Sequence, residues 1–179
     1  MYRLFTHRLV LTLSHPRLAA RVAQFNIDNR EALADTEPNR PKEYYTTWGM
    51  KQILKEEDKA SQKCQEFRFW ISLKGDDEII GTVCITNIIF GSVKSCFLSY
   101  KISAAHQGNG YATEAVAEVI DFAWKILQLH RIESYVMPRN TKSLRVMEKL
   151  GFEKEGISKR CLEVNGVWED HVRFALLNE

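Results

Sequence analysis

The chain has 179 residues, of which 45% are hydrophobic and 27% are charged, and this composition is ordinary for a globular protein. The length suits a single domain, residues 1–179, with one full hydrophobic core. The net charge is only +2, because 25 basic residues are offset by 23 acidic ones. A nucleic-acid partner normally needs a concentrated basic surface, so none is expected.

The cysteines indicate neither a metal site nor a redox motif. Cys64, Cys84, Cys96 and Cys161 never stand at Cys-x-x-Cys spacing, and no metal is expected. Free thiols fit a reducing compartment, so we expect a cytoplasmic protein. Residues 1–8 lack the apolar run of a signal peptide, and no stretch approaches the length of a membrane span. A membrane partner is therefore not expected.

The first third of the chain is expected to contain one strand, two helical segments and a long loop. Alternating leucines predict a strand over residues 8–13, and a serine cap with a first-turn proline predicts a helix from 17 to 25. Residues 26–41 are polar and proline-containing, which indicates either the wall of a binding site or a plain surface loop. Residues 42–64 form a second helical segment with a charged, solvent-facing half.

Three strands connected by short turns come next, over residues 66–73, 78–89 and 95–102. The turns are too short for parallel crossovers, so the strands predict an antiparallel meander. An amphipathic helix then begins near Ala112 and leads to a strand at 131–136. A helix of that length joins parallel neighbours, so the strands at 95–102 and 131–136 are expected to pair in parallel.

The end of the chain predicts a short helix and a hairpin. Asn140 caps the helix and Gly151 ends it. The Asn165-Gly166 turn joins strands within 152–164 and 167–177. The expected fold class is therefore α+β: a mixed, mostly antiparallel sheet of seven strands with a central splayed parallel pair, flanked by about four helices.

The turn from Gln107 to Ala112 has the composition of an anion site. Gly108 and Gly110 let backbone amides turn inward without Cβ clashes. The first N–H groups of the following helix lack intrahelical partners and point at whatever binds there. The alternative is a tight strand-to-helix connection without a ligand.

The two parallel strands could separate at their carboxyl ends, near Ile102 and Val136. Each end leads to a helix start, one at Gly110 and the other at Asn140, and ligands tend to sit outside such strand ends. One ligand could therefore place phosphates on the glycine turn and its reactive end between the strands.

These residues resemble a known superfamily. The sequence QGNGYA from Gln107 to Ala112 matches the Gln/Arg-x-x-Gly-x-Gly/Ala signature of the GNAT superfamily of N-acetyltransferases. NTKS from Asn140 to Ser143, with residues 145–152, resembles the second block of the branch that acetylates ribosomal-protein N-termini. Residues 6–11 and 165–171 resemble that branch's first strand and closing hairpin, so the resemblance spans essentially the whole chain.

The resemblance implies acetyl-CoA as cosubstrate and direct attack by an amine in a ternary complex. The pyrophosphate would lie on backbone amides of the glycine turn, and the pantetheine would pair like an extra strand with the backbone of the preceding strand. The hydroxyl of Ser143 would lie near the sulfur, where it could protonate the leaving thiolate. The implied cofactor-binding residues are Tyr100, Lys101, Ile102, Gln107, Gly108, Asn109, Gly110, Tyr111, Ala112, Asn140 and Ser143. The implied catalytic residues are Ser143 and Asn140; alternatively, Asn140 only caps its helix and Ser143 only occupies a polar helix face.

The general base stays open. Many members of the branch carry a glutamate three residues before the tyrosine of the strand that precedes the turn, and here that position is Phe97. Glu31, Glu78 and an ordered water are candidates, and an amine that loses its proton to solvent needs no strong base. His171 is a further candidate base, but its place in the closing strand favours a structural role.

Three functions are compatible with the sequence. The favoured one is acetylation of a protein N-terminal α-amine. The second is acetylation of a small amine such as a polyamine or an amino sugar, and the third, suggested by Phe97, is a CoA-binding module without catalysis. Either a monomer or a homodimer fits the pattern.

Overall fold

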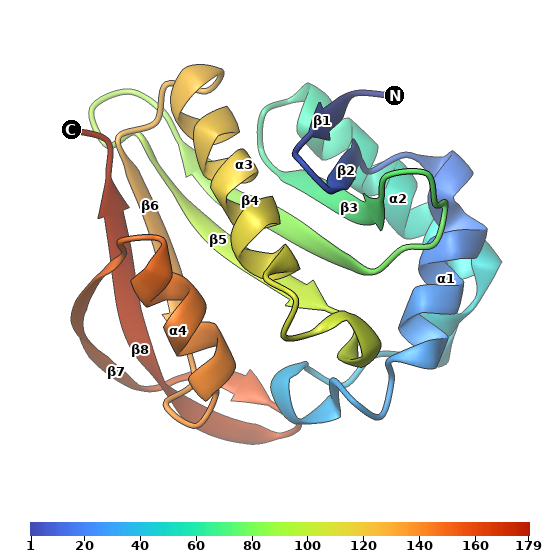
Figure 1. The fold of residues 1–179 in the computed structure, drawn as a ribbon. Helices are drawn as coiled ribbons and strands as arrows, with labels where there is room; N and C mark the ends of the chain where they lie inside the picture. The colour runs from blue at the N-terminus through green and yellow to red at the C-terminus, as the bar shows by residue number, and fades with distance from the viewer.

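The computed structural model describes residues 1–179, which form one sheet of eight strands with helices on both faces (Figure 1). The strand order is β1-β2-β3-β4-β5-β6-β8-β7. The strands are β1 (Arg3–Phe5), β2 (Leu9–Leu13), β3 (Phe67–Leu73), β4 (Gly81–Ile89), β5 (Ser95–Ile102), β6 (Arg131–Val136), β7 (Glu153–Val164) and β8 (Val167–Leu177). The α-helices are α1 (Ala19–Asp28), α2 (Thr47–Gln62), α3 (Tyr111–Lys125) and α4 (Thr141–Lys149).

The α+β fold with its central parallel pair is confirmed, but the sheet has eight strands instead of seven. The additional strand is β1, which pairs Arg3 with Thr12 at the edge of the sheet. Its three residues are too few to show alternation, and its Phe5 side chain is exposed, so no strand pattern was visible.

The first helix is also longer than expected. It starts with a 3-10 turn at Pro16–Leu18 and continues as α1 to Asp28. Asn26 and Asn29 indicated a loop, yet both are buried. The Asn29 amide donates to the Phe25 carbonyl at 2.9 Å, so the side chain reinforces the helix end, and the loop is correspondingly shorter.

Two hydrophobic cores lie on opposite faces of the sheet. The larger core packs α3 against the strands through residues such as Val116, Val119 and Phe69. The smaller core packs α1 and α2 against Trp70. None of the helices combines the length and the apolar composition that a membrane crossing requires.

The parallel pair of β5 and β6 separates partway along its length. Pairing runs only from Ser95↔Arg131 to Phe97↔Glu133. The last link is a hydrogen bond of 3.0 Å from the Ser134 hydroxyl to the Leu98 carbonyl. Beyond it, both strands continue without pairing to each other, and a gap opens in the sheet between the starts of α3 and α4.

Candidate functional site

The glycine turn forms one wall of this gap. Gly108 has φ +82° and Gly110 has φ +78°, and Gly110 immediately precedes α3. A Cβ on Gly108 would meet no atom within 4 Å, so the backbone conformation, rather than lack of space, favours glycine there. The turn leads directly into the N-terminal end of α3, where unpaired N–H groups suit an anion.

Side chains tie the turn to the strands around it. The Gln107 side-chain amide nitrogen donates to the Ile102 backbone carbonyl at 3.2 Å, and the Lys142 ammonium donates to the side-chain oxygen Oε1 of Gln107 at 2.8 Å. The Asn109 amide bonds back to the carbonyl of His106 at 3.2 Å. Gln107 therefore joins the end of β5 to the first turn of α4.

Arg8 holds the turn from outside, a role that sequence reasoning missed. Its Nη1 donates to the Asn109 carbonyl at 2.9 Å, and its guanidinium lies 4.6 Å from the centre of the Tyr111 ring. Its Nε pairs with the Glu114 carboxylate at 2.7 Å. Burial raises the pKa of Glu114, but hydrogen bonds from Thr6 and Arg8 outweigh it, and the net pKa lies below the ordinary value.

The start of α4 forms the opposite wall. The side-chain oxygen Oδ1 of Asn140 accepts from the Ser143 backbone N–H at 3.1 Å, so Asn140 does cap the helix. The Tyr100 hydroxyl reaches across from β5 and donates to the Ser143 carbonyl at 3.4 Å. Burial raises the pKa of Tyr100 to about 12. The Ser143 hydroxyl makes no hydrogen bond within the chain, so it is available to a ligand in the gap.

The edge of β5 presents free backbone groups to the gap. In an antiparallel pair alternate residues bond to the neighbour, so Leu98, Tyr100 and Ile102 direct their backbone groups away from β4. The Leu98 carbonyl is taken by Ser134, and the Ile102 carbonyl by Gln107. Of these three carbonyls, that of Tyr100 is therefore the free one for an extended ligand.

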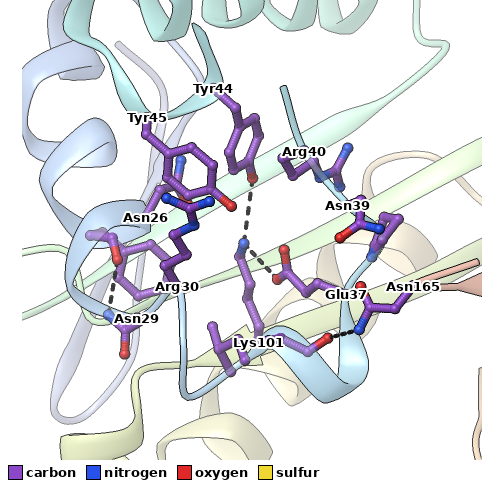
Figure 2. Close-up of a pocket in the computed structure, with 14 residues that line it drawn as sticks. Asn26, Asn29, Arg30, Glu37, Asn39, Arg40, Tyr44, Tyr45, Lys101 and Asn165 are labelled. Atoms are coloured by element: carbon purple, nitrogen blue, oxygen red, sulfur yellow. Dashed lines mark hydrogen bonds and ion pairs between the residues drawn. The ribbon is translucent and has the colours of Figure 1, made fainter. Parts of the chain in front are cut away.

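Lys101 points to the other face of the sheet, into a cavity of about 110 Å³. Figure 2 shows its ammonium between Glu37 and Tyr44. The Lys101–Glu37 distance is 2.7 Å, and the Tyr44 hydroxyl lies at 3.5 Å. The cavity is lined by Phe25, Asn26, Asn29, Arg30, Leu33, Ala34, Glu37, Pro38, Asn39, Arg40, Tyr44, Tyr45, Lys101 and Asn165.

The long loop after α1 forms much of the wall of this cavity. The tip of the β7–β8 hairpin holds the loop through a hydrogen bond from the Asn165 amide to the Ala34 carbonyl. Arg139, which follows β6, donates to the Asp35 carbonyl at 3.4 Å. Segments far apart in sequence therefore close the cavity together.

The structure changes the set of possible bases. Phe97 stacks on Tyr135 with ring centres 5.3 Å apart, so no carboxylate stands at that position. Glu31 is exposed and does not line the cavity, and Glu78 lines a separate groove beside α1. Glu37 is the one carboxylate in the cavity wall, and sequence reasoning missed it. Its only signal was its place in the long loop.

His171 has the surroundings of a structural residue. It is 5% exposed. Its Nδ1 lies 3.1 Å from the Glu169 carbonyl and 3.6 Å from the Cys161 sulfur. These contacts hold the β7–β8 hairpin together.

Comparison with known proteins gives the family. Residues 8–153 match the acetyltransferase (GNAT) domain. The chain is 44% identical over 151 residues to the probable N-acetyltransferase YjcK of Bacillus subtilis, covering 84% of this chain and 83% of the relative. It is 36% identical over 174 residues to the ribosomal protein uS5-alanine N-acetyltransferase of Escherichia coli, covering 97% and 90%.

Solved structures agree with these relatives. The ribosomal-protein-S5-alanine acetyltransferase of Vibrio fischeri is 33% identical, with a TM-score of 0.95 over 100% of this chain and 98% of its own. RimJ of Mycobacterium smegmatis, solved with CoA-disulfide, is 27% identical, with a TM-score of 0.86 over 99% and 90%. With its glycine turn and parted strands, the chain belongs to the GNAT family and is an N-acetyltransferase with ribosomal-protein acetyltransferases among its relatives.

Proposed function

We propose that this protein transfers the acetyl group of acetyl-CoA to the N-terminal α-amine of a protein, by direct attack in a ternary complex. The observation that carries the proposal is the gap between β5 and β6, with the glycine turn and Ser143 on one face and the Lys101 cavity on the other. Two substrates can approach such a gap from opposite faces and meet within it. Holding them together supplies much of the rate acceleration.

The residues around the gap fit acetyl-CoA. The positive φ angles of Gly108 and Gly110 direct backbone amides to a pyrophosphate, from Gln107 through Tyr111 to Ala112. The free backbone edge at Tyr100, flanked by Lys101 and Ile102, suits the amide groups of a pantetheine arm. The amide nitrogen of Asn140 is left for the same arm, because its oxygen serves as the helix cap.

Ser143 is the residue we assign to the leaving thiolate. Its hydroxyl is unoccupied at the start of α4, in a helix end that favours negative charge. A hydrogen bond from this hydroxyl to the departing sulfur would stabilise the thiolate as the C–S bond breaks, and the proton that the attacking amine loses would pass through the hydroxyl to the sulfur. Tyr100, with a pKa of about 12, stays a neutral donor beside it.

The position of Phe97 favours an α-amine as acceptor. No carboxylate stands there to remove the amine's proton, and the Glu37 carboxylate is paired with Lys101, so the amine must reach its neutral form readily. An α-amino group has a pKa of about 8, whereas an alkyl ammonium has a pKa of about 10.4. At neutral pH the free-base fraction of an α-amine is therefore larger by about two orders of magnitude.

The test is acetyl transfer from acetyl-CoA to three acceptors: an alanine-initiated peptide, spermidine and glucosamine. CoA release, followed with a thiol reagent, gives kcat/KM for each acceptor. The same peptide with a blocked N-terminus is the control. We expect the free peptide to have the highest kcat/KM and the blocked peptide to be inactive.

Two results would overturn the proposal. A higher kcat/KM for spermidine or glucosamine would make the protein a small-amine acetyltransferase. Tight acetyl-CoA binding in a calorimetric titration, with no transfer to any acceptor, would leave only a CoA-binding function.

A further inference from the structure

Two arginines that line the Lys101 cavity have unused hydrogen-bond donors. Arg30 lies over the Tyr45 ring at 4.7 Å and Arg40 over the Tyr44 ring at 4.9 Å (Figure 2). Neither guanidinium makes an ion pair or a hydrogen bond within the chain, and both residues line the cavity. Stacking fixes the plane of a guanidinium while leaving its edge donors free for a carboxylate.

The cavity therefore carries unbalanced positive charge. Glu37 is its only acidic group, and Lys101 already neutralises it at 2.7 Å. Arg30 and Arg40 remain without a counter-charge. A cationic acceptor such as a polyamine would be repelled, whereas an acceptor with a carboxylate would complete the charge balance.

We propose that the cavity selects acceptor peptides with Asp or Glu within the first residues after the terminal amine, and that Arg30 and Arg40 bind that carboxylate. This inference rests on the proposed function and names its substrate class. A bidentate arginine–carboxylate contact gives orientation as well as affinity, so the two arginines would set the direction in which the peptide enters the gap.

One buried side chain in the wall of the Lys101 cavity has an unsatisfied hydrogen-bond acceptor. The Asn26 side chain is 4% exposed, and its carbonyl oxygen has no hydrogen-bond partner. Asn26 lines the same cavity as the two arginines. A peptide N–H that reached this oxygen would satisfy it.

The experiment compares alanine-initiated hexapeptides that differ at the second to fourth positions, with Glu, Gln or Lys placed there singly. We expect kcat/KM for the best Glu peptide to exceed that of its Gln counterpart by about tenfold, and that of the Lys counterpart by more. Raising the salt concentration should reduce the preference. The double variant R30Q/R40Q should bring the Glu/Gln ratio to within about twofold, mainly through KM.

Arg17 provides the matched control, because it is exposed on the 3-10 turn before α1, outside the cavity. R17Q should keep the wild-type ratio. An unchanged acetyl-CoA affinity in R30Q/R40Q would show that the variant is folded. The comparison of Glu, Gln and Lys peptides on the wild-type protein does not depend on this variant. Equal kcat/KM for Glu, Gln and Lys peptides would overturn this inference and leave N-terminal acetylation intact. Absence of transfer to every peptide would instead overturn the proposed function.

Discussion

Replacing Glu114 by glutamine tests whether the first turn of α3 is held by the turn that joins β1 to β2. The Glu114 carboxylate accepts from the Thr6 hydroxyl at 2.5 Å, the Arg8 backbone N–H at 2.8 Å and the Arg8 Nε at 2.7 Å. Hydrogen bonds to a charged group contribute about 1.5–3 kcal/mol when shielded. The Arg8 side chain is 41% exposed, which lowers its share, and glutamine retains part of the geometry.

We therefore expect E114Q to lower the free energy of unfolding by about 1–2 kcal/mol, which corresponds to about 2–8 °C in Tm for a chain of this size. The pKa of Glu114 is lowered in the folded protein. Its stabilisation is thus present above the ordinary carboxyl pKa and is lost as pH falls through the lowered value. Urea unfolding should show a wild-type advantage at pH 7 that narrows below about pH 4.

The matched control is Asp121→Asn in the exposed Asp121–Lys125 pair, whose side chains are 49% and 70% exposed. That change should cost less than about 0.5 kcal/mol. Equal losses of unfolding free energy in the two variants would refute the assignment. A stability difference between wild type and E114Q that does not change with pH would refute it as well. Because Arg8 also donates to Asn109 in the glycine turn, E114Q should in addition weaken acetyl-CoA binding several-fold.

Three further predictions concern the gap itself. Ser143→Ala should lower kcat at least tenfold, because the proton donor to the thiolate is lost, and should weaken acetyl-CoA binding much less; an equal loss in both would indicate a binding role. Gly110→Ala should cost about 1–2 kcal/mol and weaken acetyl-CoA binding, whereas Gly75→Ala, at a similar φ of +82° in a remote turn, should cost stability alone. Tyr100→Phe should leave both limbs of the kcat/KM profile between pH 6 and 9 in place, because the pKa of Tyr100 is about 12; a moved limb would show that this hydroxyl titrates.

Much of the fold could be predicted because local patterns agree with tertiary structure. The strand predicted at 95–102 matches β5, and the Asn165-Gly166 turn lies between β7 and β8, as expected. The short β1 was missed because three residues show no periodicity, and its position depends on pairing with β2. The end of α1 was missed because the polar residues Asn26 and Asn29 are buried by α2 and by the helix itself.

The candidate site was predicted in part. The turn around Gly108 and the cap at Asn140 have local sequence signals, and the structure brings both to the gap. Arg8 and Glu37 have no such signal. Arg8 reaches Glu114 over 106 positions, and Glu37 meets Lys101 from the middle of an irregular loop. Contacts of that range follow from the topology and not from spacing.

The most direct test of the account is the position of the acetyl group in one peptide that carries both an N-terminal α-amine and a lysine side-chain amine. The substrate is an alanine-initiated peptide with Glu near its start and an internal lysine, incubated with acetyl-CoA at pH 7.5. Tandem mass spectrometry then locates the modification. We predict a single acetyl group on the N-terminal α-amine, formed with one equivalent of free CoA. Acetylation of the lysine side chain, with the α-amine unmodified, would contradict the account.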